Sequence, residues 1–96
     1  MTLRLKVVLF THPVCVGCGE AIGMLTRLEQ EDPEVEAVFY SLAGQSGKDL
    51  AQKWGVMAVP TLVFAENPAW RLEGVPNPQV LAQAVEGARR GVWSLG

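Results

Sequence analysis

Two cysteines, Cys15 and Cys18, are the residues of this chain best suited to chemistry. They are its only cysteines and lie near the N-terminus, with two residues between them. Thiols at this spacing can close a disulfide with each other or share a metal ion. Two cysteines are too few, and too close together, for the disulfide framework of a small secreted domain. The pair therefore indicates redox catalysis, redox sensing or metal binding.

Length and composition bound the class of protein. The chain has 96 residues, of which 49% are hydrophobic and 19% charged, and this is the balance of an ordinary globular protein. A chain this short builds one core, so we expect a single domain over residues 1–96. The net charge is −2, without a block of like charges, which argues against nucleic acid or an anionic membrane as a partner.

No segment predicts export or membrane insertion. The first apolar residues alternate with Arg4 and Lys6, which is typical of a strand, and no small-residue cleavage site follows them. The sequence holds no run of about 18 apolar residues that could span a membrane. We therefore expect a cytoplasmic protein, and in that compartment a close cysteine pair is more often catalytic or metal-binding than a static crosslink.

A strand before the cysteines and a helix after them would position the pair. Residues 3–11 alternate at first and then become apolar on both faces, as in a central strand that is covered on both sides. Residues 12–15 predict a turn, and a helix follows it. Its apolar stripe consists of Cys18, Ala21, Ile22, Leu25 and Leu28. Asp32 and Pro33 end this helix, because a residue before proline avoids helical angles.

The rest of the chain predicts three strands and two helices. We expect strands at residues 35–42, 58–64 and 70–73, and helices at residues 48–54 and 78–90. Gly55 would close the first of these helices and Asn77 would cap the second. Strands joined through helices are expected to run parallel, and a turn at Asn67 and Pro68 makes the last pair antiparallel. The fold class is therefore α/β, with a four-stranded mixed sheet and helices on both faces.

The strand-to-helix junction assigns different roles to the two thiols. Cys15 would lie at the exposed start of the helix, where unpaired backbone N–H groups and the helix dipole favour a thiolate, so we expect it to be the nucleophile. Cys18, one turn further and on the apolar stripe, would be more buried and act as the resolving thiol. Cys15 would attack a substrate disulfide, and Cys18 would break the mixed disulfide and leave the pair oxidised.

Other interpretations of the pair stay open. A zinc site within one chain lacks ligands, because the sequence has no third cysteine and His12 is its only histidine. The spacing of His12, Cys15 and Cys18 is compatible with a metal ion or an iron–sulfur cluster bound between two copies. The cysteines could also be core residues without chemistry. His12 could stabilise the thiolate as a cation, accept its proton as a neutral ring, or be a solvated turn residue.

Three segments of the chain carry a resemblance to a known family. They are Val7-Val8-Leu9-Phe10 before the turn, the cysteine pair with its two intervening residues, and Trp54-Gly55-Val56-Met57-Ala58-Val59-Pro60-Thr61-Leu62. Together they resemble the thioredoxin fold family, which includes thioredoxins and glutaredoxins, over residues 4–90. The resemblance implies that Pro60 is a cis proline facing the cysteines and that Val59 offers its backbone N–H and C=O to an extended substrate. It also implies that Gly74 lets a substrate chain pass close to the site.

Two subfamilies share the resemblance. The length of the chain and the segment at residues 10–15 are similar to glutaredoxins, in which the position of His12 often carries a lysine that binds glutathione. After the third strand, however, the chain lacks the Gly-Gly and following acid with which glutaredoxins bind glutathione, and residues 58–61 are closer to thioredoxins. Residues 16–17 match neither subfamily, and Leu9 stands where thioredoxins place a buried acid.

The resemblance implies a thiol–disulfide oxidoreductase that reduces or exchanges disulfides in protein or small-molecule substrates. We expect no cofactor, a monomer, and an electron donor that is either a thioredoxin reductase-like flavoprotein or glutathione, with the former preferred because the glutathione signature is incomplete. The predicted site consists of catalytic Cys15 and Cys18 and of substrate-binding His12, Val59, Pro60 and Gly74. The alternative is a thioredoxin-fold binding module for extended peptides, or for a metal or iron–sulfur cluster shared between subunits, with little redox turnover.

The three tryptophans of the chain give no indication of chemistry. We expect Trp54 and Trp70 to pack in or beside the core rather than to recognise a ligand. Residues 91–96, which include Trp93, predict a partly docked terminus.

Overall fold

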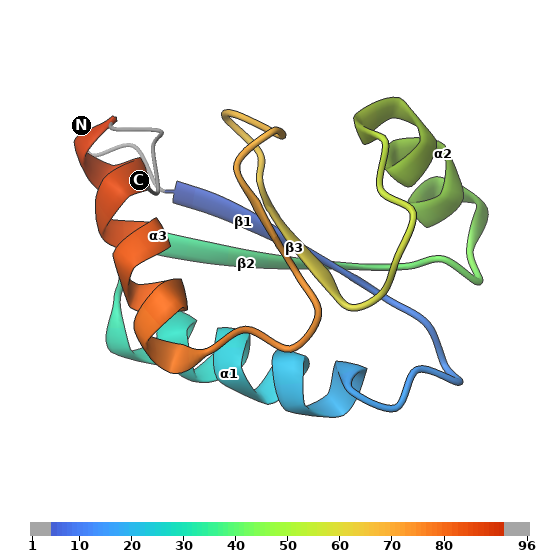
Figure 1. Cartoon of the computed structure of the whole chain (residues 1–96), viewed down its shortest axis with the longest axis horizontal. Coiled ribbons are helices and arrows are strands. Elements are labelled where there is room, and N and C mark those ends of the chain that lie inside the picture. Colours follow the sequence, from blue (N-terminus) through green and yellow to red (C-terminus); the bar gives the residue numbers. More distant parts are fainter. Residues whose placement is uncertain (1–4, 92–96) are drawn as a thin grey trace.

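A mixed four-stranded sheet with helices on both faces carries the fold (Figure 1). The structure, a computed structural model, describes residues 5–91. In chain order its elements are β1 (Leu5–Thr11), α1 (Cys18–Glu31), β2 (Val35–Ser41), α2 (Gln45–Trp54), β3 (Thr61–Phe64), β4 (Arg71–Glu73) and α3 (Pro78–Arg90). The strand order in the sheet is β2-β1-β3-β4, so β1 is an interior strand. The predicted fold class is confirmed.

The direction of β3 differs from the prediction. β1 and β2 are parallel, as expected for strands joined through a helix. β3, which also follows a helix, pairs antiparallel with β1, so that Thr61 lies opposite Phe10. The expectation that both helical connections join parallel strands is therefore wrong. Figure 1 shows the reason: α2 stays near the end of the sheet where β1 and β2 finish, so the chain enters β3 from that end.

The sheet separates two hydrophobic clusters. Val7 and Leu9 of β1 pack with α1 and α3 on one face, whereas Val8 and Phe10 pack with α2 on the other. The ring of Phe10 lies 6.0 Å from that of Trp54 and 6.2 Å from that of Tyr40, between centroids. β1 is thus buried on both faces, which confirms the interpretation of its continuous apolar run. This burial holds the end of β1, and the cysteines that follow it, in place.

Helix α1 buries a narrower stripe than predicted. Cys18, Ala21 and Leu25 are buried, and Leu28 packs partly against the same cluster. Ile22 is an exposed residue, so its assignment to the inward face is wrong. The buried positions are spaced alternately by three and four residues, and Ile22 lies to one side of that line. The predicted end of the helix is confirmed, since Asp32 follows its last residue as the C-cap.

Helix α2 begins earlier than predicted, at Gln45 rather than Lys48. Its first turn contains Gly47, where a Cβ atom would overlap the backbone carbonyl of Ser41 at the end of β2. Only glycine permits this close approach, and the short loop between β2 and α2 depends on it. Gly55 closes the helix with φ +70°, as predicted. The following strand begins at Thr61, so the predicted start at Ala58 is wrong by three residues, which include the cis peptide bond before Pro60.

Packing and a buried hydrogen bond from Trp70 attach helix α3 to the rest of the fold. Asn77 caps the helix, as predicted, because its side chain accepts a hydrogen bond from the Gln79 backbone N–H at 2.8 Å. The buried Trp70 ring donates from Nε1 to the Ala84 carbonyl at 3.2 Å, which confirms a packing role. Leu81 and Val85 belong to the cluster shared with α1.

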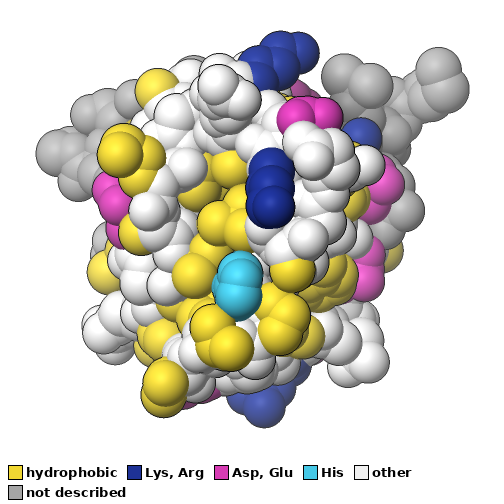
Figure 2. Space-filling view, turned by 90° about the vertical axis from the view of Figure 1, so that its right-hand side faces the viewer, with side chains coloured by type: hydrophobic (Ala, Val, Ile, Leu, Met, Phe, Trp, Pro, Cys, Tyr) yellow, Lys and Arg dark blue, Asp and Glu magenta, His cyan; other side chains and the backbone are white. Residues whose placement is uncertain are grey.

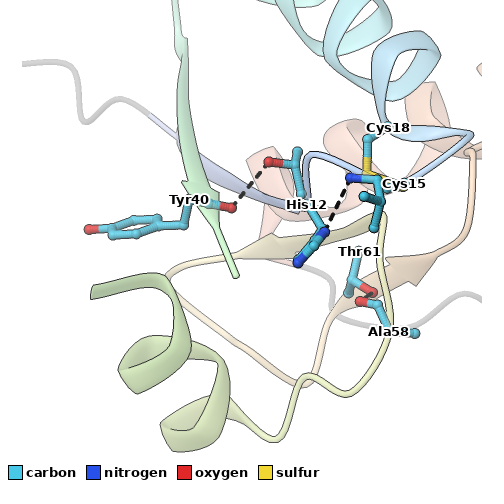
Figure 3. Close-up of a disulfide and its surroundings, with 8 residues drawn as sticks. His12, Cys15, Cys18, Tyr40, Ala58 and Thr61 are labelled. Carbon is cyan, nitrogen blue, oxygen red and sulfur yellow. Dashed lines mark hydrogen bonds between the residues drawn. A yellow bond between two sulfur atoms is a disulfide. The ribbon is translucent and has the colours of Figure 1, made fainter. Parts of the chain in front are cut away.

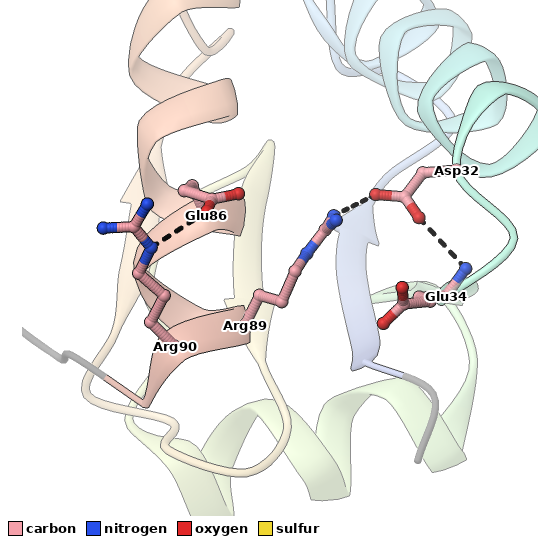
Figure 4. A network of polar contacts seen from close by, with 5 residues as sticks. All are labelled: Asp32, Glu34, Glu86, Arg89 and Arg90. Carbon is pink, nitrogen blue, oxygen red and sulfur yellow. Dashed lines mark hydrogen bonds and ion pairs between the residues drawn. The ribbon is translucent and has the colours of Figure 1, made fainter. Parts of the chain in front are cut away.

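Ion pairs at the end of α3 add little stability. Arg89 pairs with Asp32 beyond α1, and Arg90 pairs with Glu86 one turn earlier in α3 (Figure 4). Both arginines are exposed, and exposed pairs contribute roughly 0–1 kcal/mol each. The buried apolar contacts therefore fix the position of α3.

Two predictions fall outside the described residues. They concern the first two positions of the predicted first strand, residues 3 and 4, and the tail at residues 92–96. Within residues 5–91, no helix is both long enough and apolar enough to cross a membrane.

Candidate redox site

A disulfide joins Cys15 to Cys18 between the end of β1 and the start of α1 (Figure 3). The Cα atoms are 5.5 Å apart. Cys15 is half-buried, whereas Cys18 exposes only 3% of its surface and belongs to the buried face of α1. The two sulfur atoms thus differ in accessibility in the direction expected from the sequence.

Cys15 lies outside the helix, which corrects the prediction that it occupies the helix start. α1 begins at Cys18, and Gly17 is its N-cap residue. No side chain caps this end, although Ala21 N–H donates to the Gly17 carbonyl at 3.2 Å. The backbone N–H groups of the first turn are orphan donors at the positive end of the helix dipole. An uncapped end can stabilise a thiolate formed when the disulfide is reduced.

His12 organises the turn that carries Cys15. Its carbonyl accepts a hydrogen bond from Cys15 N–H at 3.0 Å, and its ring Nδ1 accepts one from Val14 N–H at 3.2 Å. Because Nδ1 is an acceptor, the proton of the neutral ring lies on Nε2. Figure 3 shows the ring on the side of the turn away from the disulfide. His12 therefore holds the turn with one nitrogen and presents an N–H donor with the other.

The loop before β3 faces the same end of the sheet. The peptide bond between Val59 and Pro60 is cis, which confirms the implication of the resemblance. Thr61, the first residue of β3, donates its hydroxyl to the Ala58 carbonyl at 2.7 Å. Among residues 5–91, the backbone N–H and C=O of Val59 have no hydrogen-bond partner. These two groups are available to an extended chain.

Three segments of the chain meet at Gly17. A Cβ atom on this residue would lie 2.7 Å from Val75 Cγ2 and 3.8 Å from Pro60 Cδ. The loop that contains Val75 is tied to the proline, because Gly74 N–H donates to the Pro60 carbonyl at 2.8 Å. Gly74 has φ +80°, a conformation that favours glycine. The structure therefore brings Pro60, Gly74 and the cysteine turn together.

Four exposed apolar side chains lie on the segments that meet here. They are Val14, Val16, Met57 and Val75, and the first three expose 81%, 101% and 95% of their surface. We call these four residues the redox face. Figure 2 shows apolar side chains gathered around the histidine on this side of the molecule. An exposed apolar patch marks a surface that binds another molecule.

Sequence reasoning missed the redox face. A single valine or methionine in a sequence is more often a core residue, so Met57 and Val75 carried no signal of their own. Val14 did carry one, because it precedes Cys15 in the predicted turn at residues 12–15, whereas Val16 falls directly after that turn, where a helix was predicted.

The described residues contain no cluster suited to a metal ion. Over residues 5–91, no group of three or more His, Cys, Asp or Glu side chains has the arrangement that a metal would need.

Fold and site together define a class of protein: a thioredoxin-fold protein with a CxxC disulfide opposite a cis-proline loop. No protein-family model matches the chain. Over 83 residues it is 30% identical to a thioredoxin of Methanocaldococcus jannaschii, and the match covers 86% of this chain and 94% of that protein. The chain belongs to the thioredoxin family and is a thiol–disulfide oxidoreductase.

Two solved structures agree with this assignment. The thioredoxin of Fasciola hepatica has a TM-score of 0.71 and 25% identity, over 86% of this chain and 80% of the other. The oxidised mitochondrial thioredoxin 3 of Saccharomyces cerevisiae has a TM-score of 0.73 and 26% identity, over 88% and 78%. Membership of the thioredoxin family implies, in general terms, a reductase and disulfide-containing substrates as partners.

The contact at Gly17 can be tested by mutation. We expect Gly17→Ala to lower the free energy of unfolding of the oxidised protein by about 1 kcal/mol, because the added methyl group meets Val75. In a Val75→Ala background this loss should fall to near zero. Urea unfolding of the four variants measures both values.

Gly23→Ala is the matched control for this experiment. Gly23 lies in α1, and a Cβ atom there would meet nothing within 4 Å. Alanine should therefore stabilise the helix by up to about 1 kcal/mol. Equal effects of Gly17→Ala in the two Val75 backgrounds would contradict the proposed contact.

Proposed function

We propose that Cys15 is the attacking thiol and Cys18 the resolving thiol in the reduction of protein disulfides. The observation that carries this assignment is the unequal exposure of the pair: Cys15 is half-buried and Cys18 is 3% exposed. The attacking sulfur must lie along the axis of the substrate S–S bond, so it needs space in front of it. The more accessible sulfur of the pair therefore reacts first.

The reaction proceeds in two exchanges. The Cys15 thiolate attacks one substrate sulfur, which forms a mixed disulfide and releases the other substrate sulfur as a thiolate that takes up a proton. The Cys18 thiol loses its proton and attacks Cys15, which releases the second substrate thiol and leaves the Cys15–Cys18 disulfide. Two electrons pass to the substrate, and the uncapped N-terminus of α1 stabilises the thiolates during both steps.

Backbone groups bind the substrate in this proposal. The free N–H and C=O of Val59 pair with an extended segment of substrate beside its cysteine, as an added strand would. Pro60 supports this segment from below, and Gly74 leaves room for it because it has no side chain. The Nε2–H of His12 donates a further hydrogen bond to the substrate in this proposal, since Nδ1 already accepts from Val14 N–H. In this proposal the protein acts as a single domain, as a monomer and in the cytoplasm. The monomeric state leaves the redox face open to partners.

Single substitutions of the cysteines separate the two roles. In an assay in which dithiothreitol regenerates the reduced protein, we expect Cys15→Ser to lower the rate of insulin reduction about 100-fold or more, to the uncatalysed rate. Cys18→Ser should retain the first exchange and accumulate a covalent mixed disulfide, because serine cannot resolve it. Turbidity measures the first effect and intact mass the second.

The reverse pattern would overturn the assignment. If Cys15→Ser accumulates the mixed disulfide and Cys18→Ser does not, Cys18 is the attacking thiol. Wild-type protein without activity would contradict the proposed reaction itself.

A flavin-dependent thioredoxin reductase, rather than glutathione, supplies the electrons in this proposal. The support is the redox face, whose exposed Val14, Val16 and Met57 suit a protein surface better than a small charged peptide. We expect insulin reduction driven by NADPH and such a reductase to exceed that driven by glutathione and glutathione reductase by about tenfold. If glutathione supports faster insulin reduction than every thioredoxin reductase of a panel, glutathione is the donor and this choice is wrong.

Substitutions of His12 distinguish its two nitrogen atoms. His12→Ala removes the hydrogen bond that the ring accepts from Val14 N–H and the proposed donor Nε2–H, so we expect kcat/KM to fall about two- to tenfold for both a small disulfide and a peptide disulfide. Asparagine can accept from the N–H two residues on, which restores the turn. His12→Asn should therefore recover the rate on the small disulfide but keep a raised KM for the peptide.

The separate kinetic constants decide this prediction. Unchanged constants for His12→Ala on both substrates would exclude a role of the ring. Full recovery by His12→Asn on the peptide as well would confine the role to the turn and exclude substrate binding by Nε2–H.

A further inference from the structure

An open groove runs beside the redox face, between α2 and the loop that leads to Pro60. Its lining residues are Leu42, Lys48, Ala51, Gln52, Gly55, Val56 and Met57, and its volume is about 460 Å³. This volume is within the range of sites that bind a small ligand or a few side chains. None of the reaction steps described above uses this groove.

The groove is continuous with the surface that surrounds the disulfide. Met57 belongs to both, and it lies three residues before Pro60. At the other side, Leu42 N–H donates to the Thr11 carbonyl at 2.8 Å, which places the groove wall beside the residue that precedes His12. An extended substrate that pairs with Val59 therefore has the groove next to its path. Figure 2 shows apolar surface around the histidine and a cationic side chain above it.

The floor of the groove is apolar. Ala51 and Val56 are buried members of the cluster on the α2 face of the sheet, and Leu42 packs partly against the same cluster. Met57 adds an exposed apolar side chain at the edge. Such a floor favours an aliphatic or aromatic side chain over water.

The rim of the groove carries a positive charge. Lys48 is the only charged residue among those that line it, it is exposed, and it makes no ion pair within residues 5–91. The adjacent acid in the sequence, Asp49, accepts a hydrogen bond from Gln45 Nε2 at 2.8 Å. Although the chain as a whole has a net charge of −2, this unpaired cation beside the substrate path favours an acidic group at this point of a partner.

We propose that this groove binds a short segment of the protein substrate in which an apolar residue is next to an aspartate or glutamate. The apolar side chain lies on Ala51 and Val56, and the carboxylate pairs with Lys48. The groove then selects among substrates without taking part in the sulfur chemistry. The proposal rests on the proposed function, because the segment belongs to the polypeptide whose disulfide Cys15 attacks.

Disulfide-linked peptides test this selection. Each peptide carries one cysteine, which forms a disulfide with a chromogenic thiol. A leucine is placed at a different distance from this cysteine in each series, and the residue after the leucine is Glu, Gln or Lys. At the best spacing we expect kcat/KM to be about three- to tenfold higher for the Glu peptide than for the Lys peptide. The preference should weaken at high salt. The chromogenic disulfide without a peptide reports the sulfur chemistry alone.

Charge reversal at two lysines of α2 supplies the matched control. Lys48→Glu should reverse the preference to the Lys peptide and leave the rate on the small disulfide unchanged. Lys53 lies in the same helix but does not line the groove, so Lys53→Glu changes the net charge equally and should preserve the preference. Equal rates for the three peptides, or equal effects of the two variants, would overturn the proposal.

Binding of redox-inert peptides separates this proposal from the proposed function. Peptides with serine in place of cysteine should bind the oxidised protein with the same order, Glu before Gln before Lys, as measured by fluorescence anisotropy. If the protein does not reduce the small disulfide but binds the serine peptides in this order, the assigned sulfur chemistry is wrong and the groove proposal is supported. If the protein reduces the small disulfide but binds the three serine peptides equally well, the sulfur chemistry is supported and the groove proposal is overturned.

Discussion

The antiparallel pairing of β3 with β1 is the constraint on which the redox site depends. It places the start of β3 beside the end of β1, with Thr61 opposite Phe10. The cysteine turn leaves one strand and the cis-proline loop enters the other at the same end of the sheet. A parallel β3 would put Pro60 at the opposite end, about 20 Å away for a strand of ordinary length. The direction of one short strand thus decides whether the disulfide has a surface that can bind a substrate.

Local signals in the sequence were sufficient for most of the fold. Gly55, Asn77 and Pro33 act within one or two residues, through left-handed backbone, side-chain capping and steric exclusion, and each ended or began its helix as predicted. The direction of β3 is not a local property. It depends on where α2 lies over the sheet, and no pattern within the strand itself records that.

The site was predictable in its chemistry and less so in its surface. Cys15 and Cys18 could be placed because they are the only two cysteines and their spacing suits a disulfide, whereas Pro60 was placed through the resemblance to the thioredoxin fold family. Val75 could not, because its importance arises from contact with Gly17 across the fold. The helix start was placed too early for a related reason: the turn at Cys15 is held by two hydrogen bonds to His12, and these compete with helical hydrogen bonds.

The redox face also constrains the order of events in the catalytic cycle. Val14, Val16 and Met57 are exposed to water at a cost in free energy that burial against a partner removes. In the proposed reaction a substrate covers this surface to reach Cys15, and the proposed protein reductant covers the same surface to reach the same sulfur. Because one disulfide serves both partners, they bind in turn and not together. The electrons are held as the Cys15 and Cys18 thiols between the two encounters, so the protein works as a carrier between partners that never meet on it.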